Sequence, residues 1–291
     1  MTKQTSKLQG IQERAMLVKF TVSRWDGRKR DDRVTQDVST TNHAENDAGA
    51  WWTHLISRKA LAPTRNAEVR GRIIHNKQTL PWNDVGYRIL PAANFLEYTK
   101  RMRKAQRDFD DAVRTLIDEY PSLLASAKDR LGELFYAEWY PEPHELAPRF
   151  AWGIDIMPLP TGGDFRVDLG STQTTAIQQH IDRHVTNKLA SATHDLWQRL
   201  YDAVNKLADR LSDTDRVIRA SLLTNLQELC ELLPRLNITQ NAKLTAMSTK
   251  IAKKVKASDL DHIRNDDTAR ASAAKATKVI LDQMAGYMGD S

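Results

Sequence analysis

The sequence lacks the features that mark secreted, membrane-spanning and disulfide-bonded proteins. It has one cysteine in 291 residues, Cys230, so no disulfide bond forms within the chain and a reducing compartment is the expected environment. It contains no run of 18 apolar residues, and no apolar signal-peptide segment follows the first ten residues. We therefore expect a cytoplasmic protein that is neither secreted nor inserted in a membrane.

The motifs of several enzyme classes are missing as well. The sequence has neither a Walker motif nor a G-x-G-x-x-G fingerprint, and no Lys-Ser/Thr pair follows Gly162 and Gly163. Cys230 has no histidine near it in sequence, and there is no G-x-S-x-G elbow for a nucleophilic serine. Neighbouring acids such as Asp110 and Asp111 point to different faces of a helix, so a two-metal site needs carboxylates from distant segments. The sequence therefore predicts no cofactor and favours a binding or assembly protein over an enzyme.

One short motif points weakly to a metal. His180 and His184 lie one helical turn apart, a spacing at which two imidazoles reach one ion, and Asp182 offers a carboxylate nearby. The metalloprotease pattern requires a glutamate directly after the first histidine, but Ile181 occupies that position. His194 is too far along the same helix to complete the site. We expect paired surface histidines and keep His180 and His184 as weak metal candidates.

Apolar periodicity is the strongest signal that the sequence does contain. Apolar residues make up 41% of the chain, enough for a folded core. Two segments carry apolar residues at helical spacing. The first seam is Phe95, Tyr98, Met102, Ala105, Phe109, Ala112 and Leu116, and the second is Ile177, Ile181, Val185, Leu189, Ala192, Leu196, Leu200, Val204, Leu207 and Leu211. Their steps average near 3.5 and 3.8 residues, which predicts an antiparallel helical hairpin of residues 91–135 against 171–233 and not a uniform coiled coil.

The remaining segments predict minor β structure around this hairpin. Residues 15–25 alternate like a strand, and a second strand is expected at 33–38. Helices are expected at 48–61, 63–76, 241–257 and 258–288, and a β-hairpin at 149–169. The helix at 258–288 has few large apolar residues before Val279, so we expect it to lie on the surface or to contact another chain. The predicted fold class is mainly α with minor β, a long coiled-coil-like hairpin carrying a small N-terminal α/β module. The predicted domains are residues 1–90, 91–240 and 241–291.

Positive charge is concentrated in the N-terminal third. The net charge is +6, residues 1–34 carry nine Lys and Arg against four Asp and Glu, and residues 58–77 carry six against one. Tryptophans 25, 51, 52 and 82 are interleaved with these cations, which is compatible with base stacking or, more commonly, with a small apolar core. The candidate nucleic-acid-binding residues are Arg24, Arg28, Lys29, Arg30, Arg58, Lys59, Arg65, Arg70 and Arg72.

The order of short motifs resembles a family of bacteriophage and prophage proteins of unknown function, over nearly the whole chain. The motifs are residues 23–29 (Ser-Arg-Trp-Asp-Gly-Arg-Lys), 55–61 (Leu-Ile-Ser-Arg-Lys-Ala-Leu), 86–91 (Gly-Tyr-Arg-Ile-Leu-Pro), the long helix with Phe109 and Tyr120, 149–153 (Arg-Phe-Ala-Trp-Gly) and 236–238 (Leu-Asn-Ile). Genes of that family often lie near those for a MoxR-type AAA+ ATPase and a von Willebrand factor A-type protein. The resemblance carries over no catalytic residues.

Two functions follow as expectations. The leading one is a non-enzymatic phage or prophage assembly or adaptor protein in the cytoplasm of a bacterial host. It would act through protein contacts, either by self-association or with the AAA+ ATPase that the resemblance implies. The alternative is a DNA- or RNA-binding or recombination accessory protein that uses the basic N-terminal third.

Overall fold

Helices dominate the structure, which confirms a mainly α fold with minor β. The computed structural model describes the chain except residues 1–9, 46, 168, 214–216, 257–259 and 289–291. The helices are α2 (Asp32–Thr41), α3 (Arg58–Gln78), α4 (Phe95–Leu131), α5 (Pro143–Leu146), α6 (Ser171–Ser212), α7 (Ala220–Leu236), α8 (Ala242–Lys256), α9 (Leu260–Asn265) and α10 (Asp267–Met288). The strands are β1 (Ala15–Ser23), β2 (Arg28–Asp31), β3 (Trp51–His54), β4 (Leu80–Pro81), β5 (Tyr87–Pro91) and β6 (Ala151–Pro158).

The chain forms two compact units that are interleaved along the sequence. The bundle unit comprises the described residues of 1–19, 76–97 and 155–291. The ribbon unit comprises those of 20–75 and 98–154. This division differs from the three consecutive domains expected from the sequence, because each unit gathers segments from distant parts of the chain.

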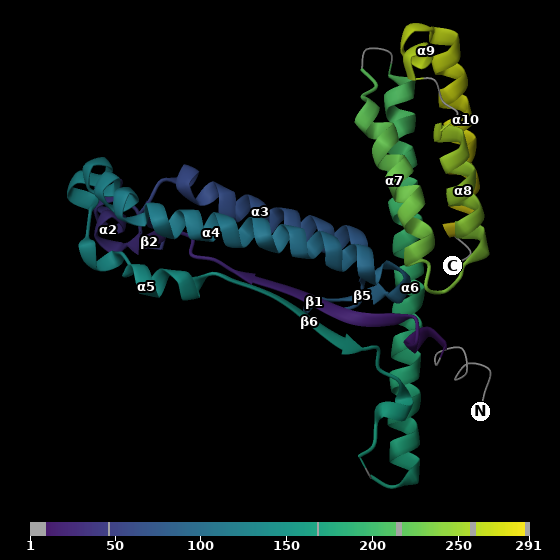
Figure 1. Cartoon of the computed structure of the whole chain (residues 1–291), viewed down its shortest axis with the longest axis horizontal. Helices are drawn as coiled ribbons and strands as arrows, with labels where there is room; N and C mark the ends of the chain where they lie inside the picture. The colour runs from purple at the N-terminus through teal and green to yellow at the C-terminus, as the bar shows by residue number, and fades with distance from the viewer. Residues whose placement is uncertain (1–9, 46, 168, 214–216, 257–259, 289–291) are drawn as a thin grey trace. The chain divides into compact units, whose positions relative to one another are not determined.

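The apolar seam of α6 is the centre of the bundle unit. Val185, Leu196, Leu200 and Val204 are each at most 1% exposed. Figure 1 shows α7, α8 and α10 alongside the C-terminal half of α6, and α7 and α10 contact that helix. The two arms of the helical hairpin are therefore α6 and α7. The seam of α6 is covered by helices of its own unit, and not by residues 91–135 as the sequence predicts.

Helix α10 also differs from its expected surface position. Its first half has few large apolar residues, but Ile280, Leu281 and Met284 in its second half are buried. Arg270 anchors the start of the helix, because its guanidinium donates hydrogen bonds to the backbone carbonyls of Arg210 and Leu211 at the end of α6. Helix α10 thus packs against α6 through a short apolar stripe in its second half and through the buried Arg270 at its start.

Strand β1, predicted from its alternating residues, is confirmed in a sheet of order β4-β5-β1-β6. It pairs antiparallel with β5, from Ala15 opposite Pro91 to Lys19 opposite Tyr87. The first arm of the predicted β-hairpin is β6, but residues 165–167 and 169 form no strand, and residue 168 lies outside the described residues. After β6 the chain enters a short 3-10 helix (Gly162–Asp164) closed by a capping box at Thr161, so no second arm forms.

Two local predictions in the ribbon unit are wrong. Residues 33–38 belong to helix α2, because Asp31 accepts hydrogen bonds from the amides of Arg33 and Val34 and so caps a helix there. Trp51–His54 is strand β3 and not part of a helix at 48–61, because these residues pair with β2. Helix α3 then runs without interruption through Pro63.

A close approach of two segments in the ribbon unit depends on a glycine. A Cβ atom on Gly71 of α3 would lie 2.3 Å from Cη2 of Trp152 and 3.1 Å from Cζ of Phe20. Both neighbours are rigid aromatic rings, and Trp152 also packs on Phe109 with 5.5 Å between ring centroids. Glycine is a poor helix former, but α3 has it at position 71 because a larger residue would displace the aromatic side chains.

We predict that Gly71→Ala destabilises the protein, against the usual sign of this change in a helix. Alanine in place of glycine normally stabilises a helix by about 0.5–1 kcal/mol, but here overpacking should cost about 1–3 kcal/mol. Urea titration measures the free energy of unfolding. Gly286→Ala in α10 is the matched control, since its added Cβ meets no atom within 4 Å and should stabilise. Equal or greater stability of Gly71→Ala would contradict this packing.

Candidate binding surface on the β2–β3 ribbon

Strands β2 and β3 form a two-stranded antiparallel ribbon whose register assigns each side chain to a face. Arg28 lies opposite His54 and Arg30 opposite Trp52. Residues directly opposite one another in such a pair share a face, and alternate residues along a strand point to opposite faces. Arg28, Arg30, Trp52 and His54 therefore occupy one face, which we call the cationic face. Trp51 belongs to the other face.

An arginine stacks on a tryptophan in the cationic face. The guanidinium carbon of Arg28 lies 4.9 Å from the ring centroid of Trp52, within the range of a cation–π interaction. The Trp52 side chain remains 46% exposed, so a ligand has access to it. The face thus presents an aromatic surface next to guanidinium groups.

Further arginines converge on His54. Nη2 of Arg58 is 2.8 Å from Nε2 of the His54 ring, and Arg130 of α4 donates hydrogen bonds to the carbonyl oxygens of His54 and Leu55. Because arginine only donates, Nε2 must be the unprotonated acceptor. Burial, and then the charges of Arg58, Arg28 and Arg130, lower the pKa of His54 below its ordinary 6.5. The imidazole is therefore neutral near pH 7 and adds no charge to the face.

Carboxylates of the same unit neutralise part of this positive charge. Five of the nine predicted cations are in ion pairs: Arg24 and Arg72 with Glu68, Arg28 with Asp26, Arg30 with Asp32, and Arg70 with Asp108. Among the described residues, Lys29, Lys59 and Arg65 are exposed and have no ion pair within 4 Å. Of the predicted set, the cationic face thus gathers only Arg28, Arg30 and Arg58, whereas Lys29 lies on the opposite face. The free charge of the ribbon is smaller than the sequence implies.

The opposite face of the ribbon carries Trp51 and borders an apolar groove. Trp51 is 45% exposed, and its backbone amide donates a hydrogen bond of 2.9 Å to Oγ1 of Thr35 in α2. A groove of about 290 Å³ opens beside it, with exposed Val38 in its wall. The groove is lined by Thr35, Val38, Ser39, Asn42, Ala44, Ala48, Gly49, Ala50 and Trp51. Lys29 lies on the same face, but no charged side chain lines the groove, which therefore offers apolar contacts.

The tryptophans divide between the two roles weighed from the sequence. Trp25 and Trp82 are buried, as expected of core residues, whereas Trp51 and Trp52 are exposed on the ribbon. Sequence reasoning missed His54 and Arg130 as parts of this surface. His54 lies two residues after Trp52, but Arg130 is 76 residues away from His54, and no local signal links them.

The other candidate sites are not assembled. His180 and His184 are exposed, and Oδ1 of Asp182 already accepts a hydrogen bond from the amide of Gly162. Within the described ranges, no three His, Cys, Asp or Glu side chains are grouped to hold a metal. Cys230 is buried, and burial together with Glu231 raises the pKa of its thiol to about 11, which disfavours the reactive thiolate.

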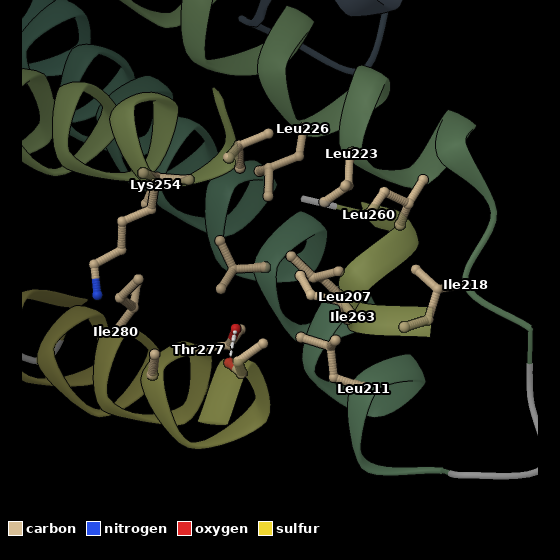
Figure 2. Close-up of a pocket in the computed structure, with 15 residues that line it drawn as sticks. Leu207, Leu211, Ile218, Leu223, Leu226, Lys254, Leu260, Ile263, Thr277 and Ile280 are labelled. Carbon is tan, nitrogen blue, oxygen red and sulfur yellow. Dashed lines mark hydrogen bonds between the residues drawn. The ribbon is translucent and has the colours of Figure 1, made fainter. Parts of the chain in front are cut away.

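An apolar cavity of about 100 Å³ lies within the bundle unit (Figure 2). Leucine, isoleucine, valine and alanine side chains line most of it, and the Thr277 hydroxyl already donates a hydrogen bond of 2.7 Å to the carbonyl of Ala273. Lys254 directs its ammonium nitrogen away from the leucines in Figure 2. The cavity lacks polar groups that would orient a ligand, so we assign it to imperfect packing.

Comparison of the chain with models of known families, with characterised proteins and with solved structures finds no match. The resemblance to phage proteins therefore rests on the short motifs alone. No helix among the described residues is long and apolar enough to cross a bilayer.

We predict a measurable pKa for His54 below 6.5 that depends on Arg58. Arg58→Gln should raise it, because one of the positive charges that disfavour imidazolium is removed, and Lys59→Gln serves as a control with the same charge change. NMR titration of the imidazole protons measures the pKa of His54 in the wild type and in each variant. Because the unfolded state binds more protons between the folded pKa and 6.5, the free energy of unfolding should fall as the pH drops through that window. An unchanged pKa in Arg58→Gln would rule out this arrangement of charges.

Proposed function

We propose that the chain is a non-enzymatic assembly or adaptor protein of a phage or prophage, acting in the bacterial cytoplasm by binding another protein through the β2–β3 ribbon. The observation that carries the proposal is the pair of exposed tryptophans, Trp51 and Trp52, on opposite faces of one short ribbon. Tryptophan and arginine are enriched among the residues that contribute most to protein interfaces. The resemblance suggests an AAA+ ATPase as the partner.

The distribution of chemistry on the ribbon favours a protein over a nucleic acid. Trp51 and Trp52 point to opposite sides, so they do not form a continuous platform on which successive bases stack. An apolar groove next to Trp51 suits an aliphatic side chain and contributes little to holding a phosphate backbone. Ion pairs also occupy Arg28 and Arg30. A partner segment fits the ribbon if its acidic residues contact the cationic face and an apolar residue enters the groove beside Trp51.

We predict that Trp51→Ala and Trp52→Ala each weaken binding to the MoxR-type ATPase by about 30-fold or more, the effect of removing a dominant interface residue. Isothermal titration calorimetry with both purified proteins measures the dissociation constant. Val279→Ala is the control, since Val279 is similarly exposed, at 49%, on α10. Unchanged affinity in both tryptophan variants would refute the ribbon as the interface. Light scattering of the chain alone tests whether a second copy is the occupant instead.

Binding of single-stranded nucleic acid is the second candidate function. The Arg28–Trp52 stack and the unpaired cations Lys29, Lys59 and Arg65 favour it, because they combine an aromatic surface with charges available to phosphates. This function would account for the basic N-terminal third without a protein partner.

For this candidate we predict a steep dependence on salt. If the three unpaired cations each neutralise one phosphate of a 20-nucleotide DNA strand, the affinity should fall roughly 20-fold between 50 and 200 mM salt. Fluorescence anisotropy measures it, with Lys29→Gln expected to reduce the slope and Lys253→Gln in α8 as the control. Binding that is weak at 50 mM salt, or that Lys29→Gln leaves unaltered, would exclude this surface as a nucleic-acid site.

A further inference from the structure

Two arginines of the bundle unit converge on one backbone carbonyl. Arg88 of β5 and Arg199 of α6 both donate a hydrogen bond from Nη2 to the carbonyl oxygen of Thr79, at 3.3 and 2.9 Å. Nε of Arg88 also donates to Oγ1 of Thr79 at 2.7 Å, and Nη1 of Arg199 donates to the carbonyl of Lys77 at 3.1 Å. These contacts hold two guanidinium groups close together in one orientation.

Their positive charges are incompletely compensated. Arg199 forms an ion pair with Asp195, at 2.7 Å between Nε and Oδ2, whereas Arg88 has no carboxylate within 4 Å among the described residues. Burial and the neighbouring Arg199 lower the pKa of Arg88, and burial lowers that of Arg199. Two partly buried guanidinium groups thus share one carboxylate, which leaves an excess of one positive charge where water screens it poorly.

The guanidinium groups line an open pocket of about 430 Å³. Its other lining residues are Asn76, Lys77, Asn225 and Leu229, so no acidic residue of the described chain lines it, and Glu228 is nearby only as the ion-pair partner of Lys77, at 2.9 Å. Arginine carries five N–H donors. The contacts of Arg88 use three of these, and those of Arg199 to the two carbonyls use one on each Nη. Two N–H groups of Arg88 and two of the Arg199 Nη atoms therefore have no acceptor among the described residues.

We propose that this arginine pocket binds the phosphate group of a phosphorylated ligand. Guanidinium groups match phosphate oxygens with paired, charge-assisted hydrogen bonds, and a dianion would supply the missing negative charge. The pocket is larger than a phosphate ion needs and falls in the size range of small-molecule sites, so it accommodates more of the ligand than the phosphate. The pocket lies in the bundle unit and uses no ribbon residue, so it is independent of the proposed function.

A purely structural role for the two arginines makes different predictions. If they served only to fasten the chain at Lys77 and Thr79, then Asp195→Asn would lower stability without creating any affinity for anions. If the pocket holds phosphate, Asp195 competes with the ligand for Arg199, and its neutralisation should tighten binding. The direction of this one change separates the two roles.

The test uses the full-length protein and pyrophosphate as probe, with chloride at matched ionic strength as reference. We expect pyrophosphate to bind and to raise the melting temperature of the wild type, and we expect Arg88→Gln to weaken binding about tenfold, as loss of charged hydrogen bonds predicts. Arg183→Gln, an exposed arginine on the same helix as Arg199, should bind like the wild type. Asp195→Asn should bind several-fold more tightly. Calorimetry measures all four dissociation constants.

No stabilisation of the wild type beyond that of chloride, or unaltered binding by Arg88→Gln, would overturn the proposal. If Arg88→Gln does not fold, weaker or equal binding by Asp195→Asn overturns it. A competition arm identifies the source of the phosphate: displacement of pyrophosphate by a 20-nucleotide DNA strand, dependent on Arg88, assigns a nucleic-acid backbone. Displacement by a nucleoside triphosphate but not by the strand assigns a small phosphorylated molecule.

Discussion

Burial of the α6 seam is the interaction on which the bundle unit depends. Side chains such as Leu196 and Leu200 contribute about 1.5–3 kcal/mol each when removed from water, and the seam places one on the core side at nearly every turn. Helices α7 and α10 are held because they cover this stripe. Arg199 lies on the same helix, so the packing that buries its neighbour Leu200 also fixes its guanidinium beside Thr79.

Periodicity made part of this fold predictable. The seams of α4 and α6 are local patterns that the structure confirms, because each depends on which face of one helix is buried. The segment of β1 is confirmed as a strand, but its burial does not alternate, since both Leu17 and Val18 are buried. What covers the α6 seam was not predictable in this way. Several amphipathic helices of suitable length are present, and spacing alone does not choose among them. In the structure the covering helices α7 and α10 follow α6 along the chain and belong to the same unit.

Secondary-structure propensity gave wrong predictions where a specific hydrogen-bonding contact outweighs it. Residues 33–38 read as a strand, yet the Asp31 carboxylate caps the first turn of α2 and a helix forms. Trp51 and Trp52 read as helical, but pairing of β3 with β2 makes them a strand and exposes both. The paired residues of β2 and β3 are 20 to 26 positions apart, and no local sequence pattern predicts their pairing.

The charges at the candidate sites also could not be predicted from the local sequence alone. The sequence identifies Arg28 and Arg30 as cations, and short-range pairing with Asp26 and Asp32 then removes much of their field in exposed positions. Arg88 and Arg199 are 111 residues apart in regions of unremarkable charge, but in the fold both contact the carbonyl of Thr79, and only Arg199 has a carboxylate partner, Asp195. An incompletely compensated charge in a partly buried place acts more strongly on a ligand than a larger number of screened and paired charges on the surface. The electrostatic consequences of this chain's basic composition are therefore decided by where the fold leaves cations without partners, and count alone does not reveal those positions.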